Sequence, residues 1–219
     1  YDEIVVERVS GLSSHMVMDQ TSGVLYICDT GNQRILKMNT NSGSIDYSLS
    51  PYGENIQGYY SMNGAEYETI IDSGLVSPTG IDLYENYLLV SDYASGEIIV
   101  YDIGHPNIIQ EIKRLQTNMI SDVMGIKVGP DGSIWYVCTN SNKLYQMLPP
   151  KSGDLNGDNN ITLSDIIIIL SHIVNTSDLN QEYYSIADIN SDSAIDVFDL
   201  LLIIDSLWWY KMESIFKKI

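Results

Sequence analysis

Two segments of the chain carry oxygen-bearing side chains at alternate positions, immediately before a run of Ile and Leu. The first is GDLNGDNNITLSD (residues 153–165), and the second is ADINSDSAIDVFD (residues 187–199). A solvated loop needs acidity but no such spacing, and a helix start needs only one capping residue. Alternate side chains of a tight loop can turn inward together around one hard cation. The repeated pattern therefore predicts two cation-binding loops.

Each loop supplies a set of ligand positions when its first Asp is numbered as position 1. Positions 1, 3, 5, 7, 9 and 12 of the first loop are Asp154, Asn156, Asp158, Asn160, Thr162 and Asp165. The same positions of the second loop are Asp188, Asn190, Asp192, Ala194, Asp196 and Asp199. Position 7 offers its backbone carbonyl, so its side chain can vary. An all-oxygen cage with many ligands suits Ca²⁺ better than Mg²⁺, and we expect two Ca²⁺ ions.

The two loops differ at position 6, where the backbone turns into the left-handed conformation. Asn159 tolerates that conformation, whereas Ser193 does so poorly. We therefore expect some strain in the second loop, partly offset by its extra carboxylate, Asp196.

Each loop runs directly into a helix, DIIIILSHIVN or DLLLIIDSLWWY, and the two loops start 34 positions apart. Position 12 is Asp in both, where sensor EF-hands have Glu. This duplicated arrangement resembles a dockerin domain, a small α-helical module with two EF-hand-like calcium loops. The resemblance covers residues 153–210.

The resemblance implies a cohesin-like protein module as the partner. Specificity in that family lies at positions 10 and 11 of each loop, together with the adjoining helix faces. The residues at positions 10 and 11 are Leu163, Ser164, Val197 and Phe198. They are more apolar than the Ser-Thr pair common in cellulosomal dockerins, which favours a different cohesin-like partner. The two pairs also differ from each other, which disfavours two interchangeable orientations.

Residues 1–148 contain three similar segments, which begin at Glu3, Tyr67 and Ile108. Gly11 and Gly74 are 63 positions apart, and so are Asp29 and Asp92. Each segment has an extended run, a polar break and three further short β-rich runs separated by turns. Four short strands in about 40 residues are typical of one blade of a β-propeller.

The segment LYICDTGNQRILKMN (residues 25–39) is similar to the NHL repeat and its D-x-x-N-x-R-I core. The position of Arg34 is taken by Glu97 in the second segment and by Lys143 in the third. The resemblance implies a six-bladed propeller, and three blades would leave open edges. We expect residues 1–148 to be the C-terminal part of a larger propeller, or to be completed by another chain.

Three smaller features leave alternatives open. The Tyr-rich insertion at residues 48–66 is either an aromatic loop that contacts a sugar or peptide, or a hairpin packed by its own side chains. His15 falls at the start of an inner strand, and one His cannot by itself form a metal site. Cys28 and Cys138 lie in non-neighbouring segments, so we expect two separate buried thiols.

Composition excludes several classes of partner and structure. The net charge of −18 argues against nucleic acid, because phosphate binding needs clustered Lys and Arg. No apolar run approaches the roughly 18 residues of a membrane span. Residues 149–152 read as a stiff linker, and residues 211–219 as a helical tail.

The sequence thus predicts a mainly β fold, a partial six-bladed propeller followed by a dockerin. The expected function is a secreted, calcium-binding attachment protein whose propeller recognises a ligand and whose dockerin binds a cohesin-bearing scaffold. One alternative is an extracellular propeller enzyme, a lyase or hydrolase with its catalytic residues in further blades, since no catalytic set is visible in these residues. Another is a structural subunit of an extracellular assembly or homo-oligomer.

Overall fold

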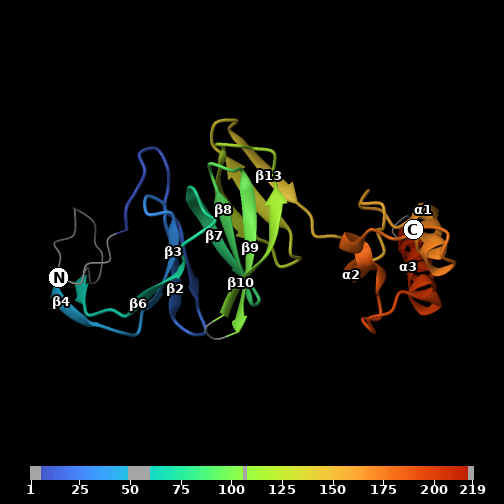
Figure 1. Cartoon of the computed structure of the whole chain (residues 1–219), viewed down its shortest axis with the longest axis horizontal. Coiled ribbons are helices and arrows are strands. Elements are labelled where there is room, and N and C mark those ends of the chain that lie inside the picture. Colours follow the sequence, from blue (N-terminus) through green and yellow to red (C-terminus); the bar gives the residue numbers. More distant parts are fainter. Residues whose placement is uncertain (1–5, 49–59, 106–107, 217–219) are drawn as a thin grey trace. The chain divides into compact units, whose positions relative to one another are not determined.

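The structure is a computed structural model, and it describes residues 6–48, 60–105 and 108–216. The chain divides into two compact units, Tyr1–Leu148 and Pro149–Ile219. Figure 1 shows that the first unit is built from strands and the second from helices and loops. The fold is therefore mainly β, as the sequence predicts.

The described strands of the first unit are short, and most are rich in β-branched and aromatic residues, which favour pleated, half-buried surfaces. In chain order they are β1 (Met16–Asp19), β2 (Val24–Asp29), β3 (Arg34–Asn39), β4 (Ser44–Ser48), β5 (Tyr60–Asn63), β6 (Tyr67–Ile71), β7 (Pro78–Tyr84), β8 (Tyr87–Asp92), β9 (Glu97–His105), β10 (Ile108–Gln116), β11 (Val123–Val128), β12 (Ile134–Cys138) and β13 (Lys143–Met147).

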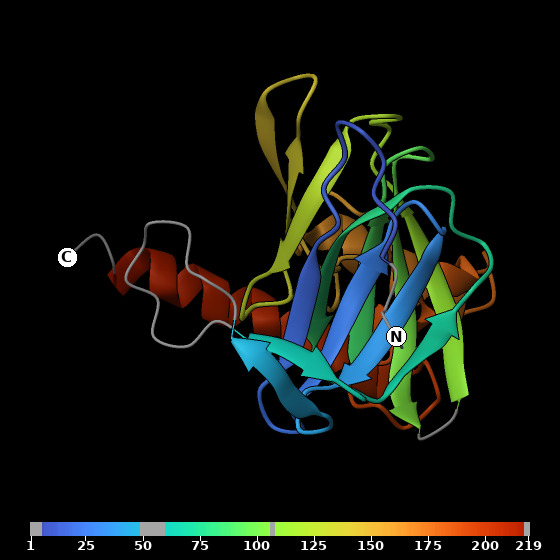
Figure 2. The same ribbon diagram turned by 90° about the vertical axis from the view of Figure 1, so that its left-hand side faces the viewer.

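Eleven of these described strands form three antiparallel meanders, and β4 pairs with β5. Sheet 1 has the order β1-β2-β3-β6, sheet 2 the order β7-β8-β9-β10 and sheet 3 the order β11-β12-β13. Figure 2 shows β1, β2 and β3, in blue, lying side by side. The turns are tight: Gly96, between β8 and β9, has a φ of +71°, and a Cβ there would lie 2.8 Å from the backbone nitrogen of Ile120. Only glycine fits that turn.

Sheet 2 is the middle layer because both of its faces are buried. On β8, Leu88 and Val90 pack in a cluster with sheet 1, whereas Leu89 packs in a cluster with sheet 3. On β9, Ile99 and Ile98 divide between the same two clusters. Successive side chains of a strand point to opposite faces, so a continuous apolar run is what a strand buried on both sides requires.

The first strands of the three sheets lie next to one another, with β7 against both β1 and β11. The His15 N–H donates to the carbonyl of Thr79 over 3.0 Å, and the Thr79 hydroxyl donates to the carbonyl of Val123 over 3.3 Å. The described residues do not close a ring of sheets. The propeller and its NHL blades are therefore not shown, and they remain a hypothesis.

The predicted repeats and the observed sheets are offset by one strand. The runs that open the second and third repeats, β6 and β10, pair with β3 and β9 of the preceding sheet. Sheet 3 consequently has three strands, although the repeat predicts four. The connection from β9 to β10 is short, so this pairing costs less loop entropy than pairing across the polar break before β11.

The motif that resembles the NHL core acts as a structural clamp. Asp29 is fully buried, and it accepts hydrogen bonds from Arg34 Nε over 2.7 Å and from the Glu7 N–H over 2.8 Å. Asn32 Nδ2 also donates to this carboxylate. The motif thus ties the end of β2 to the start of β3 and to the segment before β1.

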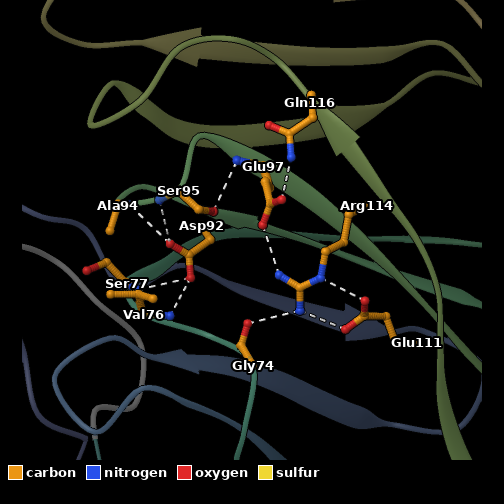
Figure 3. Close-up of polar contacts among 10 residues, drawn as sticks. All are labelled: Gly74, Val76, Ser77, Asp92, Ala94, Ser95, Glu97, Glu111, Arg114 and Gln116. Atoms are coloured by element: carbon orange, nitrogen blue, oxygen red, sulfur yellow. Dashed lines mark hydrogen bonds and ion pairs between the residues drawn. The ribbon is translucent and has the colours of Figure 1, made fainter.

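Sheet 2 makes an equivalent clamp with different residues, which Figure 3 draws. The buried Asp92 accepts from four backbone N–H groups, those of Val76, Ser77, Ala94 and Ser95. Glu97, at the position of Arg34, pairs with Arg114 of β10 over 2.9 Å, and Arg114 also pairs with Glu111. The Arg of this clamp lies on the fourth strand of the sheet instead of the third, so the sheet keeps an ion pair although the consensus decays.

β4 and β5 pair with each other as a separate hairpin that departs from sheet 1 after β3. The insertion at residues 48–66 therefore begins at the last residue of β4 and includes β5. Residues 49–59, which contain part of its predicted aromatic loop, lie outside the described residues. Whether this loop contacts a ligand stays a prediction.

The second unit contains α1 (Leu163–Ile173), a 3₁₀ turn η1 (Gln181–Tyr183), α2 (Tyr184–Ala187) and α3 (Val197–Phe216). Its core is small and centres on Ile169 of α1 and Ile203 of α3, which are both fully buried. The backbone of α3 continues through Phe216, beyond the predicted end of the dockerin at residue 210. In the part of the chain that the structure describes, none of the helices meets the length and apolarity that a bilayer crossing requires.

Candidate metal-binding loops and docking surface

Asp154, at position 1 of the first loop, organises the turn that follows it. Its side chain is almost fully buried, and its carboxylate accepts hydrogen bonds from the N–H groups of Gly157, Asp158 and Asn159 over 2.9, 3.2 and 2.6 Å. These bonds wrap the backbone around the carboxylate. They also leave a concentrated negative charge within a loop of few residues.

Asp165, at position 12, closes the same loop from the first turn of α1. It is fully buried, and it accepts from the N–H groups of Leu155 and Thr162, each over 2.8 Å. Thr162 is the N-cap of α1, and Asp165 completes a capping box with it. The residue that the sequence marks as a ligand is therefore also the one that fixes the start of the helix.

The second loop repeats these contacts less completely. Asp199 is fully buried and accepts from the N–H groups of Ile189 and Asp196 over 2.8 and 2.9 Å. Asp188 accepts from the N–H groups of Asp192 and Ser193 over 3.1 and 2.9 Å. Unlike Asp154, Asp188 is only half-buried.

Two positions in each loop have left-handed backbone. In the first loop they are Gly157 and Asn159, with φ of +74° and +64°. In the second loop they are Ser191 and Ser193, with φ of +58° and +70°. The sequence predicts the turn at position 6, but it does not single out position 4, where Gly157 is matched by Ser191. Serine carries a Cβ penalty in this region that glycine lacks, so the second loop holds two strained residues.

Most of the remaining predicted ligands are exposed, whereas Thr162 and Asp196 are half-buried. Asn156, Asp158 and Asn160 are exposed, and Asn156 Nδ2 donates to Asp158 Oδ2 over 3.0 Å. The matching pair in the second loop, Asn190 and Asp192, makes the same contact over 2.9 Å. Within the described residues, no three His, Cys, Asp or Glu side chains gather in an arrangement that could hold a metal ion.

The chemistry of the donor set nevertheless fits a hard cation. Each loop offers only oxygen donors at the predicted positions, with carboxylates at three positions of the first loop and four of the second. The backbone N–H groups point at Asp154 and Asp165 and orient both carboxylates. Such a set suits Ca²⁺, which accepts six to eight oxygen ligands in flexible geometry.

The four predicted partner-binding residues lie at the starts of α1 and α3, on the surface. Leu163 is 72% exposed and Phe198 is 61% exposed, and Ser164 and Val197 are exposed as well. Large apolar side chains that are this exposed and that group at two helix starts indicate an interaction surface.

The exposed apolar surface extends further along both helices than the sequence analysis identified. On α1 it continues through Ile167, Leu170 and Val174, and on α3 through Leu201 and Leu202. Helical residues three or four apart share a face, so the spacing of these residues from Leu163 could have revealed the α1 stripe. That face lies opposite the buried residues Asp165 and Ile169.

The second unit has no basic side chain near this surface in the sequence. Residues 152–207 include ten Asp and Glu residues, seven of them predicted Ca²⁺ ligands, but no Lys or Arg. A partner surface that contacts the two helices therefore meets apolar side chains on a module that lacks Lys and Arg.

Other candidate residues of the chain do not assemble into a site. His15 lies beside Gly125, where a Cβ would be 3.1 Å from His15 Cε1, and burial together with the nearby Lys127 lowers the pKa of its imidazole. Cys28 and Cys138 are buried free thiols, as their spacing predicts. Burial raises the pKa of both thiols, which suppresses the reactive thiolate.

The second unit consists of two loop–helix units with N–H-bonded carboxylates at positions 1 and 12 of each loop. Residues 152–207 match the dockerin type I domain, which confirms the predicted dockerin. This match supports calcium binding and a cohesin-binding role in attachment to a scaffold. The match covers the second unit only. A comparison with curated proteins gives no match to the chain.

Proposed function

We propose that residues 153–210 bind two Ca²⁺ ions and dock to a cohesin-like module, and so attach the first unit to a scaffold of an extracellular assembly. The observation that carries this proposal is the dockerin match over two loops whose carboxylates at positions 1 and 12 are already oriented by backbone N–H groups. The attachment role follows from the module, whereas the task of the first unit is a separate question.

In this proposal each ion is held by the oxygen donors at positions 1, 3, 5, 7, 9 and 12 of its loop. Bound Ca²⁺ supplies positive charge that offsets the repulsion among the carboxylates. Asp165 and Asp199 link each loop to the first turn of its helix, so order in the loop and order in α1 or α3 are coupled. The exposed stripes on the two helices depend on that order.

The partner surface contacts Leu163 and Ser164 on α1 and Val197 and Phe198 on α3. Because these side chains are mostly apolar and residues 152–207 contain no Lys or Arg, a complementary partner has an apolar patch bordered by neutral or basic groups. This composition supports a cohesin-like partner distinct from those that read a Ser-Thr pair.

For the first unit we propose an NHL-like propeller module that recognises a sugar or peptide ligand. Three meanders in series, with the first strands β1, β7 and β11 adjacent, are the arrangement that neighbouring blades adopt. A lyase or hydrolase activity in further blades and a structural role remain the alternatives. Each has its own signature: turnover for an enzyme, and completion of sheets by a neighbouring chain for a structural subunit.

The test uses the full chain and a panel of purified cohesin modules, in calorimetry with Ca²⁺ and after treatment with EDTA. We expect two Ca²⁺ ions per chain, cohesin binding that disappears in EDTA, and loss of helical circular dichroism with retention of the β signal. Leu163→Asp with Phe198→Asp is expected to abolish cohesin binding without changing Ca²⁺ uptake. A chain that takes up no Ca²⁺, or whose helices ignore the chelator, would overturn the proposal.

A further inference from the structure

A row of three side chains crosses sheet 1 on the face that meets sheet 2. Tyr26 of β2 lies opposite Lys37 of β3, and Lys37 lies opposite Glu68 of β6. Directly opposed residues of antiparallel strands share one face of the sheet. Tyr26 packs in the cluster that sheet 1 shares with sheet 2, so Lys37 and Glu68 are on this face as well. The row is buried at Tyr26 and exposed at Glu68.

The two charged residues of this row form an ion pair at a pocket between the sheets. Lys37 Nζ lies 3.2 Å from Glu68 Oε1. The pocket has a volume of about 330 Å³, and it is lined by the row from sheet 1 and by Ile103 of β9 and Ile109 of β10 from sheet 2. Both isoleucines are partly buried against the shared cluster. The pocket therefore combines an apolar part from sheet 2 with a charged pair from sheet 1.

A second pocket begins at the same ion pair. It has a volume of about 460 Å³, and Lys37 and Glu68 line it together with the polar side chains of Ser22, Asn39 and Glu66. Because the two pockets share Lys37 and Glu68, they are neighbouring parts of one groove along sheet 1. Sites for small ligands commonly have volumes of roughly 300–1,000 Å³, so each part has room for a ring of a small ligand.

The packing of the sheets does not itself require a charged pair at this place. The repeat distance of 63 positions sets Leu89 at the place of Tyr26 and Val100 at the place of Lys37. Leu89 is buried in the cluster that sheet 2 shares with sheet 3, and Val100 packs against that cluster. Apolar side chains thus serve at the equivalent positions between sheets 2 and 3. An exposed ion pair contributes little to stability, so the fold does not account for the Lys37–Glu68 pair.

The charges in the groove favour a neutral ligand. At neutral pH the charges that the described lining residues of the smaller pocket carry are those of Lys37 and Glu68, which have opposite sign. In the larger pocket Glu66 adds a negative charge. An anion in the groove therefore meets two carboxylates, and a cation meets the ammonium group of Lys37.

The polar and apolar groups of the smaller pocket match the two kinds of surface on a sugar ring. The Lys37 ammonium donates hydrogen bonds and the Glu68 carboxylate accepts them, so together they can hold two neighbouring hydroxyl groups. A pyranose ring also has a face of C–H groups, which can pack on Ile103 and Ile109. A few polar groups placed beside apolar side chains are what fixes the orientation of a small ligand.

We propose that this groove binds a neutral saccharide, with one pyranose ring beside Ile103 and the next ring beside Asn39. The inference rests on the proposed recognition of a sugar or peptide by the first unit, and it names the ligand class and the site. It is independent of how many sheets complete that unit. An extended peptide is matched less well, because such peptides add to the backbone of a strand edge, whereas the polar groups here are side chains on a sheet face.

The experiment uses the full chain and the neutral disaccharides maltose, cellobiose, lactose and N,N′-diacetylchitobiose. Saturation-transfer NMR reports which sugar protons contact the protein, and calorimetry gives the dissociation constant. We expect at least one of these sugars to bind with a millimolar dissociation constant, because ordering the ligand offsets much of the gain from a partly solvated groove. Saturation is expected to reach the C–H protons of the bound ring.

Three variants test the site. Lys37→Met and Glu68→Gln nearly keep the size of each side chain and remove its charge, so each is expected to weaken sugar binding roughly ten-fold through loss of a charged hydrogen bond. Their melting temperatures are expected to match that of the parent chain, since the ion pair is exposed. Lys113→Met is the matched control, because Lys113 lies opposite Val100 in sheet 2 as Glu68 lies opposite Lys37 in sheet 1. It is expected to leave sugar binding unchanged.

Saturation transfer to none of these sugars, or equal sugar binding by the parent, Lys37→Met and Glu68→Gln, would overturn this inference. An alanine pentapeptide is titrated in parallel. Its binding in place of the sugars would overturn the saccharide site and leave a peptide as the ligand of the first unit. The same samples are assayed for Ca²⁺-dependent cohesin binding, which is expected to persist in all three variants. Loss of docking with sugar binding intact overturns the docking proposal alone.

Discussion

The carboxylate of Asp165 accepts a hydrogen bond of 2.8 Å from the backbone N–H of Leu155, and this contact joins the end of the first loop to its beginning. Asp199 makes the same contact with Ile189 in the second loop, also over 2.8 Å. The residue at the last predicted ligand position of each loop thus also lies in the first turn of the helix that follows. In the first loop, loop closure and helix capping converge on one buried side chain, Asp165, which is also a predicted ion ligand.

We expect Asp165→Asn to destabilise the second unit much more than the substitution of an exposed carboxylate. The amide keeps the size of the side chain, but it removes a charged acceptor of several hydrogen bonds, each of which contributes roughly 1.5–3 kcal/mol. Thermal unfolding followed by the helical circular dichroism signal, in saturating Ca²⁺, measures the effect. Asp178→Asn, at an exposed site, is the control, and equal melting of the two variants would contradict the prediction.

We expect the left-handed backbone of Ser191 and Ser193 to lower the Ca²⁺ affinity of the second loop relative to the first. Replacing Ser191 and Ser193 by glycine relieves strain of about 1–2 kcal/mol per residue, less the greater unfolded-state entropy of glycine. A net gain of about 1 kcal/mol corresponds to roughly five-fold in the dissociation constant of the second loop. Calorimetric Ca²⁺ titration is the measurement.

The reciprocal variant, Gly157→Ser, provides the matched control in the first loop. A Cβ at Gly157 meets only Tyr183 Oη, at 3.5 Å, so the substitution adds backbone strain without a clash. It is expected to weaken Ca²⁺ binding at the first loop and to leave the second unchanged. If Ser→Gly weakens binding or Gly→Ser strengthens it, strain does not set the difference between the loops.

The local sequence predicts the dockerin because its two loop–helix units are defined by neighbouring residues. Each ligand set spans twelve residues, and the capping of α1 by Thr162 and Asp165 involves neighbours in sequence. Tertiary contacts decide what the sequence analysis missed. The left-handed backbone at Ser191 is indicated in the sequence only by its match to Gly157, and the spacing of Ile167 and Leu170 from Leu163 allows a stripe on α1 but does not show that this face is exposed.

In the first unit, the local sequence predicts where the strands lie but not how they pair. Strand positions follow from period-2 runs and turns, but the strand that completes each sheet depends on contacts between distant residues. The D-x-x-N-x-R-I pattern is conspicuous in sheet 1, whereas sheet 2 builds the clamp from backbone N–H groups on Asp92 and from the Glu97–Arg114 pair. Glu97 can stand at the position of Arg34 because Arg114, on the neighbouring strand β10, supplies the positive charge.

Burial of the two thiols predicts their reactivity. Cys28 and Cys138 are fully buried, and burial raises the pKa of each thiol, so the thiolate is scarce at pH 8. We expect neither residue to react with an aromatic disulfide reagent in the native protein, and both to react in guanidinium chloride. Thr139→Cys, at the exposed neighbour of Cys138, is expected to add one rapidly reacting thiol. Rapid reaction of the unmodified native chain would contradict the observed packing.

The β4–β5 hairpin is expected to be dispensable for the fold of the first unit. β4 and β5 pair only with each other among the described strands, and β3 and β6 pair directly without them. The chain ends that would be joined already lie close, because a Cβ on Gly43 would be 2.9 Å from the carbonyl oxygen of Asn63 and 3.0 Å from the nitrogen of Ala65. Joining Gly43 directly to Gly64 therefore leaves a short glycine turn between β3 and β6, and surface hairpins tolerate such deletion.

We expect the variant without the hairpin to keep its β signal in circular dichroism. The melting temperature of the first unit is expected to stay within a few degrees of that of the parent chain. Deletion of β6 as well is the contrasting variant, because it removes the fourth strand of sheet 1 and is expected to lower the melting temperature sharply. Global unfolding on removal of the hairpin alone would show that it belongs to the core of the unit.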